Sequence, residues 1–213
     1  MKKVFLTAFL AMSMMAFAQH VTPLNITIAE LRLDSLRTLY FSEPTMYRAS
    51  LDVAAQAFDK NEEELKEAKS ILKDEQSHAK EMESSLKDAQ KMTASLKKIY
   101  TQEENTLKSM QKTVEKQQRK LNTNKRLNQD ARSSYTQMME RQQKELGYAL
   151  REVAERLRAV SELNTSIQNW QTTLQTFKQE TEQKANALAL LESQYKERTS
   201  ALKAEQKTAK KMQ

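Results

Sequence analysis

Apolar residues recur in the first half of the chain with the period of a coiled coil. From Leu65, alternating steps of three and four residues reach Leu121 without a slip, and 13 of these 17 positions are apolar. The a positions are Leu65, Leu72, Ala79, Leu86, Thr93, Tyr100, Leu107, Val114 and Leu121, and the d positions are Ala68, Glu75, Met82, Ala89, Leu96, Glu103, Met110 and Gln117. Because so narrow a seam leaves a lone helix poorly buried, we expect a coiled-coil arm over residues 46–121 that packs on another helix.

A second periodic region covers residues 131–213 with a less regular pattern. Two consecutive steps of four, from Met138 through Gln142 to Leu146, predict a stutter, and two steps of three between residues 157 and 163 predict a stammer. A regular register follows from Leu163 to Glu205, and the Lys-rich residues after it are expected to fray. This region is the second predicted arm.

The segment between the arms, residues 122–130, is polar and rich in Asn but has neither Gly nor Pro. Asn favours caps and turns, so the chain is expected to be irregular there. A continuous helix would be a rod that dimerises along its length, whereas a fold-back gives an antiparallel hairpin. The similar arm lengths favour the hairpin. A fold-back centred on residue 126 places Lys184 near Glu67 and Ala68, and Trp170 near Ala79 and Met82.

Residues 19–45 precede the first arm. Thr27 and Glu30 have the spacing of a capping box, which predicts a short amphipathic helix from there to about Tyr40. Pro44 then punctuates the chain before the next helix. The predicted fold class is therefore all-α: a long coiled coil folded as an antiparallel helical hairpin with its turn near 122–130, preceded by a short N-terminal helix.

Residues 1–18 have the pattern of a secretory signal peptide. Lys2 and Lys3 precede an apolar run over residues 4–17, and Ala16 and Ala18 form an A-x-A cleavage pattern. The run has 14 residues, fewer than the roughly 20 that a spanning helix needs, which disfavours the alternative of an uncleaved anchor. We expect cleavage after Ala18, export to the periplasm or beyond the cell, and no transmembrane span after cleavage.

The composition argues against an enzyme. The 213 residues include one Gly, two Pro and no Cys, which excludes disulfides, thiol catalysis and glycine-rich phosphate loops. His78 has no second His within one helical turn, and the acidic run at 59–64 lacks the Gly of a calcium loop, so it is interpreted as a solvated helix start. No catalytic residue, metal or cofactor is expected.

Charge is unevenly distributed along the first arm. Residues 59–88 hold 10 acidic and 6 basic side chains, whereas residues 89–132 hold 4 acidic and 11 basic. The candidate contacts for an anionic partner are Lys112, Lys116, Arg119, Lys120, Lys125, Arg126 and Arg132. Such a patch attracts lipid head groups, cell-wall polymers or acidic proteins, and its alternative role is to keep the helix solvated. Export makes nucleic acid an unexpected partner.

An export signal followed by a long coiled coil resembles two groups of bacterial envelope proteins. The pattern is similar to the coiled-coil half of murein-hydrolase activators, without their Gly-rich globular domain. The small basic helical arms also resemble periplasmic chaperones of the Skp type, without their strands at both ends of the chain. These resemblances imply an exported, non-enzymatic scaffold or adaptor that binds a protein partner or itself. The alternative is a chaperone-like binder of unfolded clients.

Overall fold

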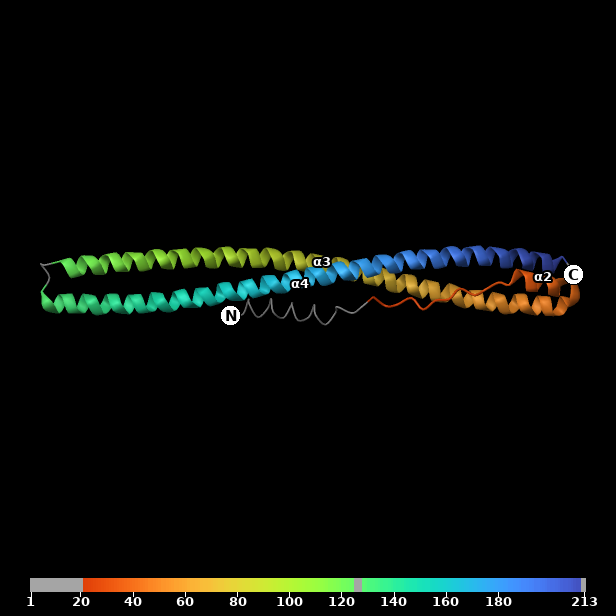
Figure 1. The fold of residues 1–213 in the computed structure, drawn as a ribbon, viewed down its shortest axis with the longest axis horizontal. Coiled ribbons are helices and arrows are strands. Elements are labelled where there is room, and N and C mark those ends of the chain that lie inside the picture. Colours follow the sequence, from red (N-terminus) through yellow and green to blue (C-terminus); the bar gives the residue numbers. More distant parts are fainter. Residues whose placement is uncertain (1–20, 125–127, 212–213) are drawn as a thin grey trace. The chain divides into compact units, whose positions relative to one another are not determined.

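The computed structural model describes residues 21–124 and 128–211. Within these residues the chain forms helices α2 (Leu33–Ser42), α3 (Pro44–Thr123) and α4 (Gln129–Lys210) and no strand (Figure 1). The two long helices pack against each other, which confirms the all-α helical hairpin and its turn. Contacts divide the described residues into a first unit, up to Glu83 and from Thr173 onward, and a second unit, between Ser84 and Thr172. The predicted signal peptide lies outside the described residues.

Asparagine residues lie at both ends of the turn. Asn128 Oδ1 accepts the N–H of Ala131 at 2.9 Å and caps the start of α4. At the end of α3, the carbonyl of Asn124 accepts a hydrogen bond from Arg132 Nη2 at 2.7 Å. These contacts therefore satisfy backbone groups that have no partner within the helices, at a turn that has no Gly or Pro to break the helix.

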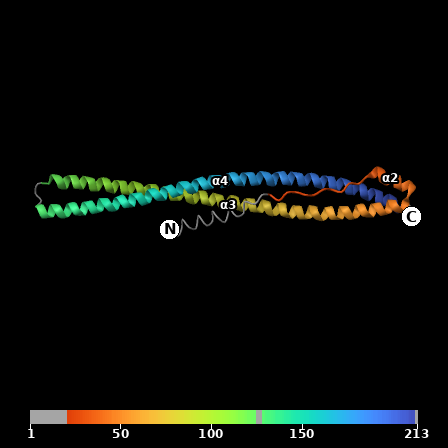
Figure 2. The same ribbon diagram turned by 60° about the horizontal axis from the view of Figure 1, so that its bottom comes forward.

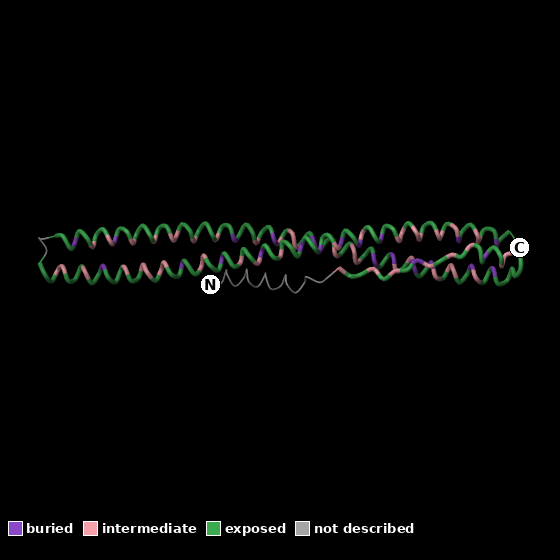
Figure 3. The backbone as a smooth tube through the Cα atoms, viewed as in Figure 1, coloured by how far each residue is buried: buried purple, intermediate pink, exposed green. Residues whose placement is uncertain are grey.

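The heptad predicted for α3 describes its buried face. All nine predicted a positions are buried or half-buried, and the same register extends back to Phe58 and Leu51, which are buried. Figure 3 shows that buried and half-buried residues recur at regular intervals along the long helices. The d positions differ along the helix. Those up to Glu103 are at least half-buried, whereas Met110 and Gln117 are exposed.

The buried face of α4 follows an unbroken heptad, so the predicted stutter and stammer are wrong. Its a positions, all buried or half-buried, are Arg132, Met139, Leu146, Val153, Val160, Ile167, Leu174, Thr181, Leu188, Tyr195, Leu202 and Ala209. Met139 is 9% exposed and Met138 is 44% exposed. The prediction took the most apolar neighbour at each step, but packing against α3 buries the same position of every heptad, even where it holds Arg or Thr.

The two arms meet in a register displaced toward the loop from the one predicted. Lys184 pairs with Glu75 and not with Glu67, a displacement of about two turns along α3. In the second unit, Gln171 hydrogen-bonds Gln90. Helical side chains lean toward the N-terminus of their own helix. In an antiparallel pair, α4 side chains therefore lean toward the loop and contact α3 residues that lie nearer to it.

Residues 21–32, called the strap from here on, are extended and not helical. The capping box at Thr27 and Glu30 does not form, and α2 begins only at Leu33. Leu24, Ile26 and Ile28 are buried or half-buried, while the residues between them are exposed. Burying these alternate apolar side chains against the first unit is favoured over forming one more helical turn before α2. The strap lies along the long helices of that unit (Figures 1 and 2).

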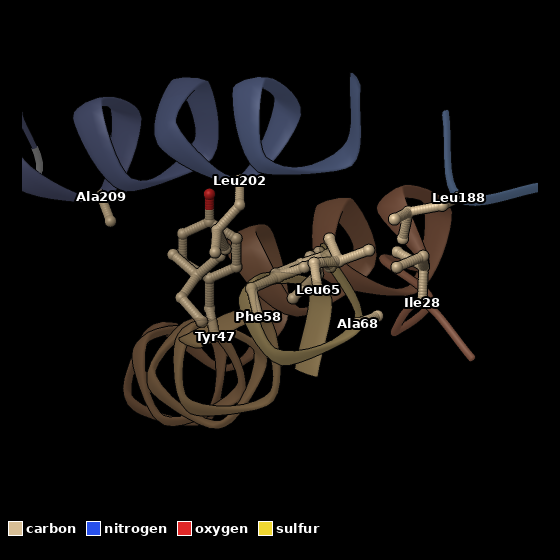
Figure 4. Close-up of a cluster of buried hydrophobic side chains, with 10 residues drawn as sticks. Ile28, Tyr47, Phe58, Leu65, Ala68, Leu188, Leu202 and Ala209 are labelled. Carbon is tan, nitrogen blue, oxygen red and sulfur yellow. The ribbon is translucent and has the colours of Figure 1, made fainter. Parts of the chain in front are cut away.

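The strap and all three helices contribute to the apolar core of the first unit. Its buried members are Ile28, Leu36, Tyr47, Leu51, Phe58, Leu65, Ala68, Leu188, Leu202 and Ala209. Figure 4 shows Tyr47 of α3 pointing toward α4 near Leu202, and Ile28 of the strap lying close to Leu188. The strap thus adds a further layer to a core that the three helices otherwise form.

Candidate functional site

The first candidate surface is the seat of the strap, which Asn61 of α3 organises. Asn61 is only 5% exposed. Its Nδ2 donates to the carbonyl of Thr27 at 3.0 Å and to Glu64 Oε2 at 3.1 Å, and its Oδ1 accepts the N–H of Ala29 at 2.8 Å. One side-chain amide therefore pairs with a donor and an acceptor of the strap, as the next strand of a sheet would.

Two further side chains bind the backbone of the strap. Arg198 Nη1 donates to the carbonyls of Ile28 at 2.7 Å and Ala29 at 2.8 Å. Glu75 Oε1 accepts the N–H of Thr22 at 3.0 Å. Thr22 and Ala29 are seven residues apart in the strap, and their partners Glu75 and Asn61 are 14 residues apart in α3. At about 3.3 Å per extended residue and about 1.5 Å per helical residue, both spans are about 22 Å. The strap is therefore fully extended.

The residues that bind the strap share one heptad position. Asn61 and Glu75 are d residues of α3, and Arg198 is the d residue that follows Tyr195 in α4. The strap thus covers the d side of the seam in the first unit. Sequence reasoning missed Asn61 and Arg198. The available signals were the period-two alternation of Leu24, Ile26 and Ile28 and the polar residues at seam positions.

The second candidate surface is the d side of the second unit, which no described segment covers. A groove of about 550 Å³ runs there between the helices. It is lined by Ser109, Met110, Thr113, Val114, Gln117, Gln142, Glu145, Leu146 and Ala149. Gln117 and Gln142 are d residues that are exposed and make no hydrogen bond to a described residue. The seam is therefore open on this side, with both apolar and amide groups available.

Large apolar side chains concentrate on this same side. Those at d and g positions, each between 43% and 55% exposed, are Met92, Ile99, Met110, Tyr135 and Met138. Tyr148 is also exposed, but the guanidinium of Arg151 lies 4.9 Å from its ring centre. Five exposed apolar residues at d and g positions on one side of a helix pair form a surface suited to another protein segment.

The basic residues predicted as anion contacts fall into three groups. Lys112, Lys116, Arg119 and Lys120 are exposed on α3 and form no ion pair with a described residue. Arg132 is half-buried, and its guanidinium binds the carbonyl of Asn124. Lys125 and Arg126 lie outside the described residues. Four free cations thus lie on the last turns of α3.

Two other groups weighed in the sequence, the acidic run at 59–64 and His78, form contacts within the fold. The run at 59–64 lies well inside α3, so its interpretation as a helix start is wrong. There Glu62 pairs with Lys66 at 2.6 Å and accepts a hydrogen bond from Tyr195, and these contacts hold the pKa of the Glu62 carboxyl below its usual value. His78 lies beside Glu81 and the ring of Phe177. The described residues contain no cluster of three potential metal ligands among His, Cys, Asp and Glu.

Across the described part of the chain, no helix has an apolar stretch long enough to cross a membrane. A scan against protein-family models gives no match, and searches of the curated proteins and of the solved structures give none either.

Proposed function

We propose that the protein is an exported, non-enzymatic coiled-coil scaffold or adaptor of the bacterial cell envelope that acts through protein–protein contacts. The open groove of the second unit supports this proposal most directly. Met110 lies exposed in the groove beside two exposed amides at d positions, and Tyr135 and Met138 are exposed on the same side of the second unit. A partner segment laid in the groove and along this side would bury these side chains, as the first unit buries Ile28 of the strap.

Site-specific photo-crosslinking tests the groove. A photoreactive amino acid replaces Met110 in the groove, and a matched chain carries it at Asn105, which is also exposed but lies outside the groove lining and outside the cationic surface. We expect ultraviolet light to produce discrete adducts with envelope proteins from position 110 and not from position 105. Equal adducts from both positions, or none from position 110, would contradict the adaptor proposal.

A chaperone-like binder is the second candidate, and the methionines favour it. Met92, Met110 and Met138 are all exposed on one side of the second unit, and flexible thioether side chains adapt to many partner shapes. A chaperone should suppress aggregation of an unfolded outer-membrane protein, and Met110→Glu should weaken that effect. Discrete adducts without any suppression would favour the adaptor.

The exposed cations of α3 supply a second contact in the adaptor proposal, toward an anionic surface of the envelope. Lys112, Lys116, Arg119 and Lys120 carry positive charge and form no ion pair with a described residue, and each such cation contributes about 1 kcal/mol at an anionic lipid surface. We expect binding to phosphatidylglycerol vesicles that falls with added salt and with Lys116→Glu, and no binding to phosphatidylcholine vesicles. Salt-independent binding would contradict this contact.

A further inference from the structure

The seat of the strap recognises mainly backbone. Asn61, Arg198 and Glu75 bind five main-chain groups of the strap and none of its side chains. Side-chain selection comes from the alternating inner face, where Leu24 and Ile26 are half-buried and Ile28 is 4% exposed. Backbone hydrogen bonds combined with alternate apolar side chains are the way in which proteins recognise extended peptides.

We propose that this seat is a peptide-binding site whose ligand is an extended segment with apolar residues at alternate positions, and that the strap of a second copy of the chain replaces the chain's own strap there. The three polar side chains bind the backbone, and the apolar surface around Leu188 takes the residue at the Ile28 position. The site lies in the first unit and is independent of the groove in the second.

The contacts between the arms do not depend on the strap. Tyr47 of α3 hydrogen-bonds Glu205 of α4, Lys69 pairs with Glu192, and Lys178 pairs with Glu83. Among the described residues, the backbone from Thr22 to Glu30 makes no hydrogen bond to another main-chain group. The strap is therefore held by a few side-chain contacts and one buried Ile, and it can leave while the hairpin persists.

The chain's own strap has the advantage of its tether. A short linker holds a ligand at an effective concentration of about 1 mM, so a free peptide competes poorly with an intact strap. Ile28→Asp weakens the strap and leaves Asn61 and Arg198 in place. Asn25→Asp is the matched control, because Asn25 lies on the exposed face of the same strap.

The first test measures binding of a labelled synthetic peptide of residues 21–32 to full-length chains by fluorescence anisotropy. We expect the Ile28→Asp chain to bind it at least tenfold more tightly than the wild-type or Asn25→Asp chain. Adding Asn61→Ala should weaken binding by about 30-fold, since two hydrogen bonds of roughly 1 kcal/mol each are lost. Equal binding to all chains, or no effect of Asn61→Ala, would overturn the proposal.

The second test asks whether a second copy supplies the ligand. The Ile28→Asp chain has an intact seat and a poor strap, and a chain carrying Asn61→Ala and Arg198→Ala has the reverse. We expect a mixture to form a 1:1 complex by light scattering that neither chain forms alone; a mixture without that complex overturns the assignment to a second copy. If circular dichroism shows that Ile28→Asp does not fold, Ala29→Pro replaces it, because it removes the N–H that Asn61 Oδ1 accepts and keeps the side chains of Leu24, Ile26 and Ile28.

Discussion

Lys184 Nζ of α4 lies 2.9 Å from both carboxylate oxygens of Glu75 in α3, and the two side chains are only 5% and 13% exposed. Both residues occupy d positions of their helices. The same carboxylate accepts the N–H of Thr22 from the strap. One ion pair therefore fixes the register of the two arms and the position of the strap.

Replacing Lys184 by Met should destabilise the first unit strongly. The change leaves Glu75 mostly buried without its cation, which typically costs about 3 kcal/mol or more. Urea unfolding followed by circular dichroism measures this cost. Lys178→Met is the control: its pair with Glu83 is 43% and 39% exposed, and such pairs contribute under about 1 kcal/mol. Equal costs for the two variants would show that Glu75 is better solvated than its burial indicates.

The double variant Glu75→Leu with Lys184→Met tests the role of this pair further. Apolar residues of similar size commonly replace a buried ion pair without loss of stability. We therefore expect the double variant to be more stable than Lys184→Met alone, as measured by the same urea midpoint. A double variant that is less stable than the single one would mean that the contact of Glu75 with the strap carries most of the effect.

The hairpin was predictable from sequence because its determinants are local and repeated. The heptad from Leu65 to Leu121 and the Asn-rich break specify two helices and a turn whatever the finer packing. The register of the two arms was harder to predict from sequence. It depends on the direction in which side chains such as Lys184 lean along their helix, and on the conformation of the turn. In α4, polar residues at a positions, such as Arg132, concealed a regular heptad.

Replacing each of two neighbouring methionines by Asp, in separate variants, tests that heptad. Met139 occupies an a position and is buried, whereas Met138 occupies a g position and is exposed. Met139→Asp should therefore lower the free energy of unfolding by about 3 kcal/mol, since it places a carboxylate in the seam. Met138→Asp should stay within about 0.5 kcal/mol of wild type. If Met138→Asp were more destabilising than Met139→Asp in urea unfolding, the predicted stutter would be supported.

The strap was missed because two periodicities compete within it. Thr27 and Glu30 satisfy a helix-start pattern, while Leu24, Ile26 and Ile28 alternate as in a strand. Local sequence does not rank these alternatives. The choice depends on Asn61 and Arg198, more than 30 and 160 residues away, which supply the hydrogen-bond partners that an extended backbone needs.

Gly147 should make α4 less stable than an alanine at the same position would. It lies inside the helix, and a Cβ added there would meet no atom within 4 Å. Gly147→Ala should thus raise the free energy of unfolding by about 0.5–1 kcal/mol, because it lowers the backbone entropy of the unfolded chain. Ala154→Gly, at an exposed position of the same helix, should cost a similar amount. A destabilising Gly147→Ala would indicate that this turn must bend.

Alkaline pH should destabilise the first unit through Tyr47. Burial raises the pKa of Tyr47 to about 12, and the hydrogen bond from its hydroxyl to Glu205 Oε2 at 2.7 Å adds to the shift. A pKa raised above its ordinary value of about 10 means that the folded chain holds this proton more tightly than the unfolded chain. The resulting stabilisation is complete below pH 10 and is lost as the pH rises through 12.

Comparison with Tyr47→Phe isolates this contribution from the titration of lysines in the same range. The variant lacks the hydroxyl, so it should be less stable than wild type at pH 8 because the bond to Glu205 is gone. Between pH 10 and 12 its urea midpoint should fall less steeply than that of wild type, and the two profiles should converge. Parallel profiles over this range would mean that Tyr47 ionises in the folded chain as easily as in the unfolded one.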